Sequence, residues 1–188
     1  MIIGLTGPMA SGKTTVVNAL KKNGFKHITL SAIIREEAKN QNIEEKRENL
    51  MAIGQKLREE FGAGVLAKKS LEKIISEGGD KWLVDGIRNP AEVLELRNNP
   101  NFILIANTAP EDLIVERIFG RKRDDDTLDK ETIRKQLKRE MGEGEPEDGQ
   151  QVAKCIDMAD YIFENTMPVE EVESEFMKLY NQIINNSN

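Results

Sequence analysis

Cysteine and histidine, which supply many metal and catalytic sites, are nearly absent from this chain of 188 residues. It has one cysteine, Cys155, and one histidine, His27, so a cysteine-based zinc site and an internal disulfide are both excluded. A single cysteine agrees with a reducing, cytoplasmic location. We interpret Cys155 as a small core or helix-surface residue, and His27 as a structural residue without ligand partners.

The chain also lacks long apolar runs and an excess of basic residues. No apolar stretch approaches the roughly 20 residues that a membrane span requires, and residues 1–7 lack the length and basic flank of a signal peptide. The net charge is −6, with 33 acidic against 27 basic residues. Because a polyanion partner usually requires a basic face, we expect neither nucleic acid nor membrane as a partner. The chain is expected to be a monomer or a small homo-oligomer.

Short apolar segments alternate with amphipathic segments along the chain. The apolar segments are rich in Ile, Leu, Val and aromatic residues, which is typical of buried strands. They are residues 2–6, 27–30, 82–85, 102–106 and 161–164. Helical periodicity is found over residues 13–24, 110–122 and 170–184. Strands separated by helices predict a three-layer α/β/α fold with a five-stranded parallel sheet.

No linker and no internal repeat divides the chain, so we expect a single domain over residues 1–188. Residues 31–79 carry helical patterns without a convincing strand, which predicts a helical insert between the second and third strands. Residues 121–150 combine a basic loop, a charged helix and the acidic, turn-rich stretch GEGEPEDG. We expect this second region to be a mobile flap.

The segment GPMASGKT, residues 7–14, fits the phosphate-binding pattern G-x-x-x-x-G-K-[ST] without a mismatch. Its glycines let the backbone close around an anion, and the helix that follows points its N–H groups at that anion. Lys13 would bridge the outer phosphates, and the hydroxyl of Thr14 would hold Mg²⁺. The expected nucleotide-binding residues of this P-loop are Gly7, Ala10, Ser11, Gly12, Lys13, Thr14 and Thr15. ATP and Mg²⁺ are the expected donor and cofactor, with a preference for GTP left open.

A P-loop is shared by switches, motors and kinases, so the other motifs decide between them. The chain has no N-K-x-D segment for reading guanine and no L-S-G-G-Q-like transporter signature. Ring ATPases are usually longer. These absences, together with the helical insert and the basic flap, favour a small-molecule kinase.

The stretch WLVDGIRN, residues 82–89, places Asp85 at the carboxyl end of a predicted strand, where open α/β sheets bind ligands. Asp85 could hold Mg²⁺ through water, and Arg88 could bind a phosphate through two parallel hydrogen bonds. The alternative is that Asp85 only caps the helix that follows. Asn89 is better placed for that role, because it directly precedes Pro90.

These segments together resemble the nucleoside monophosphate kinase superfamily, whose members are similar to adenylate kinase. Within it, the chain looks most like dephospho-CoA-kinase-like P-loop kinases. The shared segments are REEA (35–38), KLREEFG (56–62), VDGIRNPAEV (84–93) and ADYIFEN (159–165). The likeness covers nearly the whole chain. It implies a nucleotide-kinase core, an acceptor-binding insert at 31–79 and an arginine-bearing lid at 121–150.

The resemblance also implies roles for individual arginines. Arg35 matches the arginine that closes the family's first acceptor-binding helix, and would contact the acceptor phosphate together with Arg88. Arg117 would stack on the adenine, while Arg121 and Arg123 would neutralise charge on the transferring phosphoryl group. An exposed basic helix end is the alternative for each of these lid arginines. The residues expected to take part in catalysis are Lys13, Asp85, Arg88 and Arg121.

One departure from the family bears on the acceptor. Family members usually have an acidic residue just before the arginine of the first insert helix, but this chain has no carboxylate between Thr29 and Ile34. A phosphate acceptor is already ionised and needs charge cancellation, whereas a sugar hydroxyl benefits from a positioned base. The absence therefore favours a nucleoside monophosphate over dephospho-CoA, although Asp85 could itself act as the base.

Two further alternatives remain open at the level of sequence. The stretch GQQV (149–152) resembles the kinase-like region of some deoxycytidylate deaminases, which favours a deoxynucleoside monophosphate as the acceptor. A regulatory protein that binds ATP without rapid turnover is the alternative from another class.

Overall fold

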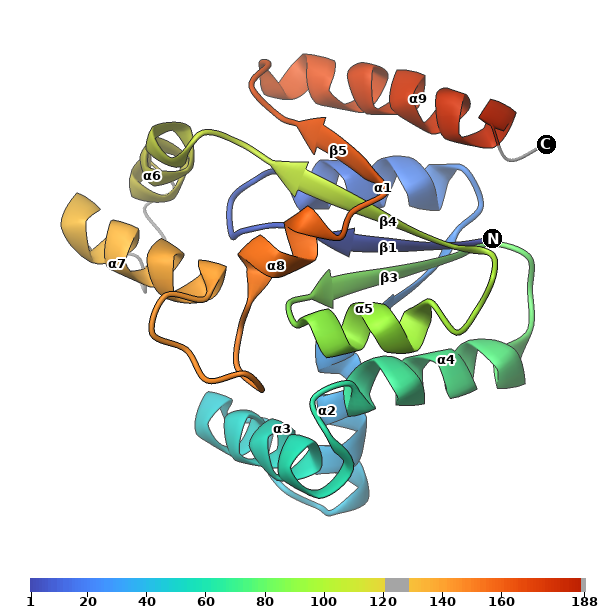
Figure 1. The fold of residues 1–188 in the computed structure, drawn as a ribbon, viewed down its shortest axis with the longest axis vertical. Helices are drawn as coiled ribbons and strands as arrows, with labels where there is room; N and C mark the ends of the chain where they lie inside the picture. The colour runs from blue at the N-terminus through green and yellow to red at the C-terminus, as the bar shows by residue number, and fades with distance from the viewer. Residues whose placement is uncertain (121–128, 187–188) are drawn as a thin grey trace.

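The computed structural model describes residues 1–120 and 129–186, and five parallel strands form one sheet at its centre (Figure 1). The strands are β1 (Ile2–Thr6), β2 (Lys26–Thr29), β3 (Trp82–Ile87), β4 (Phe102–Thr108) and β5 (Tyr161–Glu164). Their order across the sheet is β2-β3-β1-β4-β5. The predicted five-stranded parallel sheet is confirmed. The second strand ends one residue earlier than expected, because Leu30 already begins a helix.

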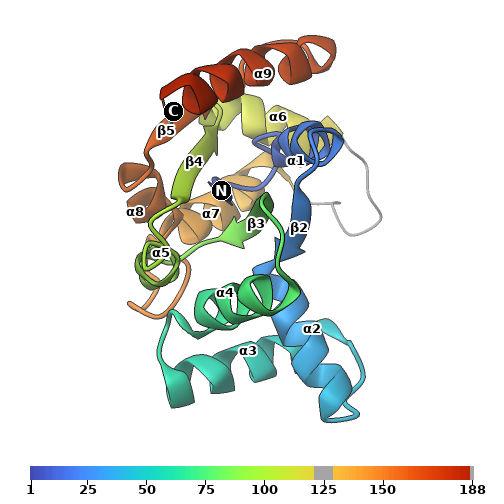
Figure 2. The ribbon, with the colours of Figure 1, turned by 90° about the vertical axis from the view of Figure 1, so that its right-hand side faces the viewer.

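Helices cover both faces of the sheet, which explains why the strands read as continuous apolar runs. All five residues of the central strand β1 are buried. One face packs against α1 (Lys13–Lys22) and α9 (Val169–Asn186). The opposite face packs against α4 (Val65–Glu77), α5 (Pro90–Leu96) and α8 (Val152–Asp157). The three-layer α/β/α architecture is therefore confirmed, and Figure 2 shows the layers from the side.

The region between β2 and β3 is helical, as predicted. It contains α2 (Leu30–Asn40), α3 (Arg47–Phe61) and α4. Helix α4 lies on the sheet, whereas α2 and α3 extend beyond it at the lower end of the molecule (Figures 1 and 2). Apolar residues of α2 and α3, such as Ile33 and Leu57, still join the same core as α4.

Helices α6 (Glu111–Gly120) and α7 (Lys130–Met141) stand beside the carboxyl end of the sheet (Figure 1). They pack against each other through a small apolar cluster that contains Ile118 of α6 and Leu137 of α7. Met9 and Ala10 of the P-loop pack against the same cluster. Helix α7 is thus in direct contact with the phosphate-binding loop.

Cys155 is fully buried in α8, which confirms its interpretation as a core residue. Burial raises the pKa of this thiol to about 12, so it is protonated at neutral pH. Among the helices of the described ranges, none is long and apolar enough to cross a membrane.

Candidate functional site

The P-loop joins β1 to α1 at the carboxyl edge of the sheet, and its two glycines are required by close backbone contacts. Gly7 and Gly12 have φ angles of +132° and +98°, which residues with a side chain rarely adopt. A Cβ atom on Gly7 would lie 2.0 Å from the carbonyl oxygen of Asn107, and one on Gly12 would lie 2.0 Å from Nδ2 of Asn165. Ala10 also has a positive φ, of 56°. The loop therefore has the tightly curled form that its sequence predicts.

Two asparagines from neighbouring strands hold this curled loop in place. Asn107 of β4 and Asn165, which directly follows β5, both donate through Nδ2 to the carbonyl oxygen of Ser11, at 2.6 and 2.9 Å. Arg117 of α6 then donates to the main-chain and side-chain oxygens of Asn165, both at 3.1 Å. Arg117 thus lies beside the P-loop, whereas its stacking on an adenine stays a prediction.

Lys13 lies inside the loop that precedes it. Its Nζ donates to the carbonyl oxygens of Gly7 and Pro8 at 2.6 and 2.7 Å. Burial lowers the pKa of this ammonium to about 8, although the nearby carboxylates of Glu140 and Asp85 favour its charged form. Thr14 and Thr15 occupy the first turn of α1, where the positive end of the helix dipole favours a bound anion.

Asp85 reaches the site from the end of β3, where the strand contains a bulge. Leu5 pairs with Asp85 and Thr6 pairs with Ile87, so Gly86 is left without a partner in β1. Such bulges redirect side chains next to functional sites. Oδ2 of Asp85 lies 3.8 Å from Nε2 of His27, whereas Oδ1 is buried without a hydrogen-bond partner.

The residues present fit Mg²⁺. A buried carboxylate oxygen without a partner, on Asp85, is the kind of hard oxygen ligand that Mg²⁺ uses directly or through water. Thr14 adds a hydroxyl at the start of α1. The alternative interpretation of Asp85 as a helix cap is wrong. Asn89 caps α5 in a capping box with Glu92, and Pro90 occupies the first helical position.

Arg88 lies between the site and the segment that follows α7. Its guanidinium donates to Oε1 of Gln150 at 3.2 Å, and its carbonyl oxygen accepts from the amide of Gln151 at 2.7 Å. Next to it, Nδ2 of Asn89 donates to the carbonyl oxygens of Glu147 and Gly149, both at 2.8 Å. The acidic, turn-rich end of the proposed lid is therefore hydrogen-bonded to Arg88 and Asn89, at the junction of β3 and α5.

Arg35 is exposed on α2, where its partners are local. It donates to Oγ of Ser31 at 3.3 Å, and its Nε lies 3.5 Å from a carboxylate oxygen of Glu45. A shared contact of Arg35 and Arg88 with an acceptor phosphate stays a prediction. Arg121 and Arg123 lie outside the described residues.

The structure brings further residues to the site that the motifs do not reveal. His27 lies beside Asp85 and has a charged neighbour after all. Glu140 of α7 accepts from the amide of Met9 at 2.8 Å. Arg58 of α3 lies close enough to the buried Glu92 to counteract the effect of burial, which raises the pKa of that carboxyl. A signal for Glu140 exists in the sequence, because it continues the apolar stripe of α7.

Buried polar atoms without a hydrogen-bond partner gather at this edge of the sheet. Among the described residues they are Ser11 Oγ, His27 Nε2, Asp85 Oδ1, Asn107 Oδ1 and Glu140 Oε1. Each belongs to the P-loop or to a residue in the contacts described above. Since buried polar groups in folded proteins are nearly always paired, such a cluster is typical of a site that binds a polar ligand.

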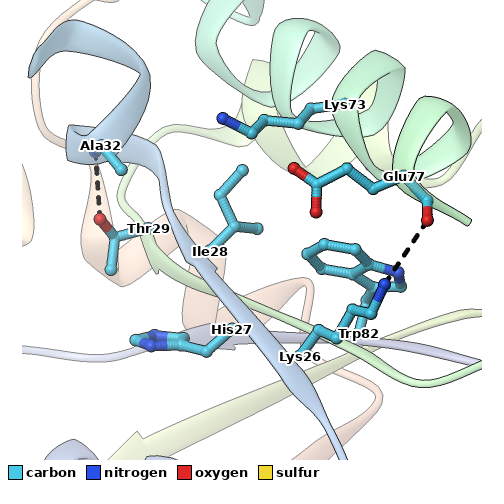
Figure 3. Close-up of a pocket in the computed structure, with 8 residues that line it drawn as sticks. All are labelled: Lys26, His27, Ile28, Thr29, Ala32, Lys73, Glu77 and Trp82. Carbon is cyan, nitrogen blue, oxygen red and sulfur yellow. Dashed lines mark hydrogen bonds between the residues drawn. The ribbon is translucent and has the colours of Figure 1, made fainter. Parts of the chain in front are cut away.

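A cavity of about 400 Å³ lies beside this site, along the outer edge of β2 (Figure 3). Its lining residues are Lys26, His27, Ile28, Thr29, Ala32, Lys73, Glu77 and Trp82. Figure 3 shows His27 on the opposite side of β2 from Trp82. No P-loop residue lines the cavity, so it does not itself form the phosphate-binding site.

The fold and the site define the class of this protein. A P-loop follows the central strand of a five-stranded parallel sheet, and an Asp-Gly-x-Arg segment ends the neighbouring strand. This is the arrangement of a nucleoside-monophosphate-kinase-like P-loop protein, as the resemblance implied.

Comparisons with known proteins agree with that class. A family model described as an AAA domain matches residues 6–134. A UPF0200 protein of Thermococcus kodakarensis is 32% identical over 98% of both chains. A UPF0200 protein of Sulfurisphaera tokodaii is 36% identical over 97% of both chains. The chain therefore belongs to the UPF0200 family and carries the AAA domain.

Solved structures with the same fold include small-molecule kinases. The dephospho-CoA kinase of Campylobacter jejuni aligns with a TM-score of 0.54 and 19% identity, over 97% of this chain and 96% of that chain. The shikimate kinase of Aquifex aeolicus also aligns with a TM-score of 0.54, at 18% identity over 98% and 99%. The structure of TT1252 from Thermus thermophilus has a TM-score of 0.62 and 18% identity over 97% of both chains. These likenesses show the P-loop kinase fold.

Proposed function

We propose that this protein is an ATP- and Mg²⁺-dependent phosphotransferase that moves the γ-phosphoryl group of ATP to a nucleoside or deoxynucleoside monophosphate. The observation that carries the proposal is that Asp85 and Arg88 lie close enough to Lys13 of the P-loop to act on its charge. Buried polar atoms that lack partners surround these residues. This arrangement has a phosphate cradle, a carboxylate for a metal and a second cation for another phosphate. Phosphoryl transfer needs positioning and charge neutralisation more than a nucleophilic side chain.

On the donor side, the amides of the P-loop and the first turn of α1 would bind the ATP phosphates. Lys13 would leave the carbonyl oxygens of Gly7 and Pro8 and turn towards the outer phosphates. Thr14 and Asp85 would hold Mg²⁺, Asp85 through water. Bound Mg²⁺ would supply charge to the β- and γ-phosphate oxygens.

On the acceptor side, we assign the insert at 31–79 to binding and the segment 121–150 to the lid. Arg88 would bind the acceptor phosphate, with Arg35 as its second contact. From the lid side, Arg117 would stack on the adenine of ATP, and Arg121 and Arg123 would neutralise charge on the transferring phosphoryl group. A second candidate function is transfer to a sugar hydroxyl, as in a dephospho-CoA-type kinase. One observation favours it, which is that Oδ1 of Asp85 lacks a partner and could accept a hydroxyl proton.

An acceptor screen tests the proposal. The protein is incubated with ATP–Mg²⁺ and, separately, with each ribonucleoside monophosphate, each deoxynucleoside monophosphate and dephospho-CoA. We expect ADP formation that depends on at least one monophosphate. Stimulation by dephospho-CoA alone would favour the hydroxyl acceptor. If the rate of ADP formation is the same with and without each acceptor, the result would contradict a kinase and favour an ATP-binding regulatory protein.

The pH dependence of ATP binding follows from the burial of Lys13. The pKa of Lys13 is about 8 in the free protein, and bound phosphates raise it because they favour the charged ammonium. ATP affinity should therefore fall as the pH rises through 8. At roughly pH 9, binding should take up most of one proton, which calorimetry measures in two buffers of different ionisation enthalpy. Lys13→Arg stays charged and should bind ATP without this proton uptake.

A further inference from the structure

Glu140 is a buried acidic residue in a position that disfavours one. It lies in the last turn of α7, where the helix dipole favours cations, and its side chain is only 3% exposed. It continues the apolar stripe of Ile133 and Leu137, with spacings of four and three residues. The neighbouring Arg139 points outwards and pairs with Glu145. Burial of a carboxylate on the apolar stripe of a helix costs free energy, so such a residue is expected to be paired or to have a function.

The two oxygens of this carboxylate face two different parts of the transfer site. Oε2 accepts from the P-loop amide of Met9 at 2.8 Å. Oε1 lies 3.7 Å from Nη1 of Arg88 and has no hydrogen-bond partner. Glu140 therefore links the loop that would bind the donor to the arginine that would bind the acceptor. The same Nη1 of Arg88 donates to Oε1 of Gln150 at 3.2 Å.

A direct role in binding ATP is disfavoured by charge. Glu140 lies near Lys13, so its negative charge repels an incoming phosphate rather than attracting it. Its charge, 3.7 Å from Nη1 of the half-exposed Arg88, would instead favour one region for this long side chain. Ordering of that kind lowers the entropy cost of reaching a reactive geometry. Ordering of Arg88 by Glu140 would therefore raise kcat and strengthen acceptor binding.

On the basis of the proposed function, we propose that Glu140 is a positioning residue that aligns Arg88 with the P-loop for phosphoryl transfer. It acts through Arg88 and does not itself touch the transferred group. In this role Glu140 does not act as a catalytic base, so it does not substitute for the acidic residue that the chain lacks between Thr29 and Ile34. Glu140 connects the P-loop, through the amide of Met9, to Arg88, which would bind the acceptor.

The test is a double-mutant cycle in the transfer assay, with ATP–Mg²⁺ and the best acceptor of the screen. Glu140→Gln keeps the shape and an acceptor for the Met9 amide, but removes the charge. We expect kcat to fall about 100-fold, because a small displacement of Arg88 is enough for such a loss. ATP affinity, measured by calorimetry, should be unchanged or tighter. The double variant E140Q/R88A should be no slower than Arg88→Ala alone.

Glu170→Gln is the matched control, since Glu170 is exposed in the first turn of α9, outside the P-loop, the insert and the lid. It should behave as the wild type. If Glu140→Gln fails to fold, Glu140→Asp replaces it, because the charge is kept but its reach is shortened by one methylene. Wild-type kcat in the variant used, additive losses in the cycle, or an equal loss of ATP affinity would each overturn the positioning role. A wild-type protein that transfers to no acceptor would overturn the proposed function as well, whereas the other outcomes leave it standing.

Discussion

Lys13→Met is expected to reduce phosphoryl transfer on the order of 1,000-fold, because it removes the cation that would neutralise the outer phosphates in the transition state. Methionine fills most of the volume of the lysine stem, so the packing of the loop is preserved. The variant also removes a charged group that burial disfavours, which is why the pKa of Lys13 is lowered to about 8. It also leaves the carbonyl oxygens of Gly7 and Pro8 without the Nζ donor, which opposes that gain, so the melting temperature should change by only a few degrees. Transfer is measured as the formation of the phosphorylated acceptor.

Lys21→Met is the matched control for Lys13→Met. Lys21 lies on the same helix, α1, but is exposed in its last turn, away from the P-loop. Its loss should leave both transfer and ATP binding unchanged. If Lys13→Met kept more than about a tenth of the wild-type rate, a loss that corresponds to only 1.4 kcal/mol, the assignment of the P-loop as the donor site would be wrong.

The sheet and the P-loop could be predicted from the sequence because their signals are local. Apolar runs such as residues 102–106 are long enough to be recognised as buried strands, and each has its place in the sheet. The glycines of the P-loop are likewise recognised from a short local motif, although the close contacts that require them come from Asn107 and Asn165. Asn89 as the cap of α5 also follows from local sequence, since it directly precedes Pro90.

The supports of the site could not be predicted, because they come from distant parts of the chain. Asn165 is 154 residues from the Ser11 carbonyl oxygen that it binds, and Glu140 is 131 residues from Met9. Only the packing of α7 on the P-loop brings Glu140 there. The sequence indicates no partner for His27, because no ligand type stands near it. The β2–β3 register pairs His27 with Leu83, two residues before Asp85, and the two side chains approach to 3.8 Å. Such residues are found by asking which charged side chains fall on buried faces.

Arg88→Ala should impair use of the acceptor far more than binding of ATP, by lowering kcat at least as much as the roughly 100-fold expected for Glu140→Gln and by weakening acceptor binding. The guanidinium is a cation of the site that lies outside the P-loop motif, and it is half-exposed with Gln150 and Glu140 beside it. A charged hydrogen bond to a phosphate contributes about 1.5–3 kcal/mol, so the KM of the acceptor should rise by roughly 10- to 150-fold. ATP affinity, measured without acceptor, should change by less than about threefold.

Two variants make the test of Arg88 specific. Arg88→Lys keeps the charge but loses the two-pronged geometry, so it should recover only part of the acceptor affinity. Arg97→Ala also removes an arginine, but one that binds Met158 and Asp160 just before β5 begins, and it should leave the acceptor KM unchanged. Equal losses of ATP and acceptor binding in Arg88→Ala would mean that Arg88 serves the donor. The acceptor phosphate would then have to be bound by cations of the insert, such as Arg35 and Arg58.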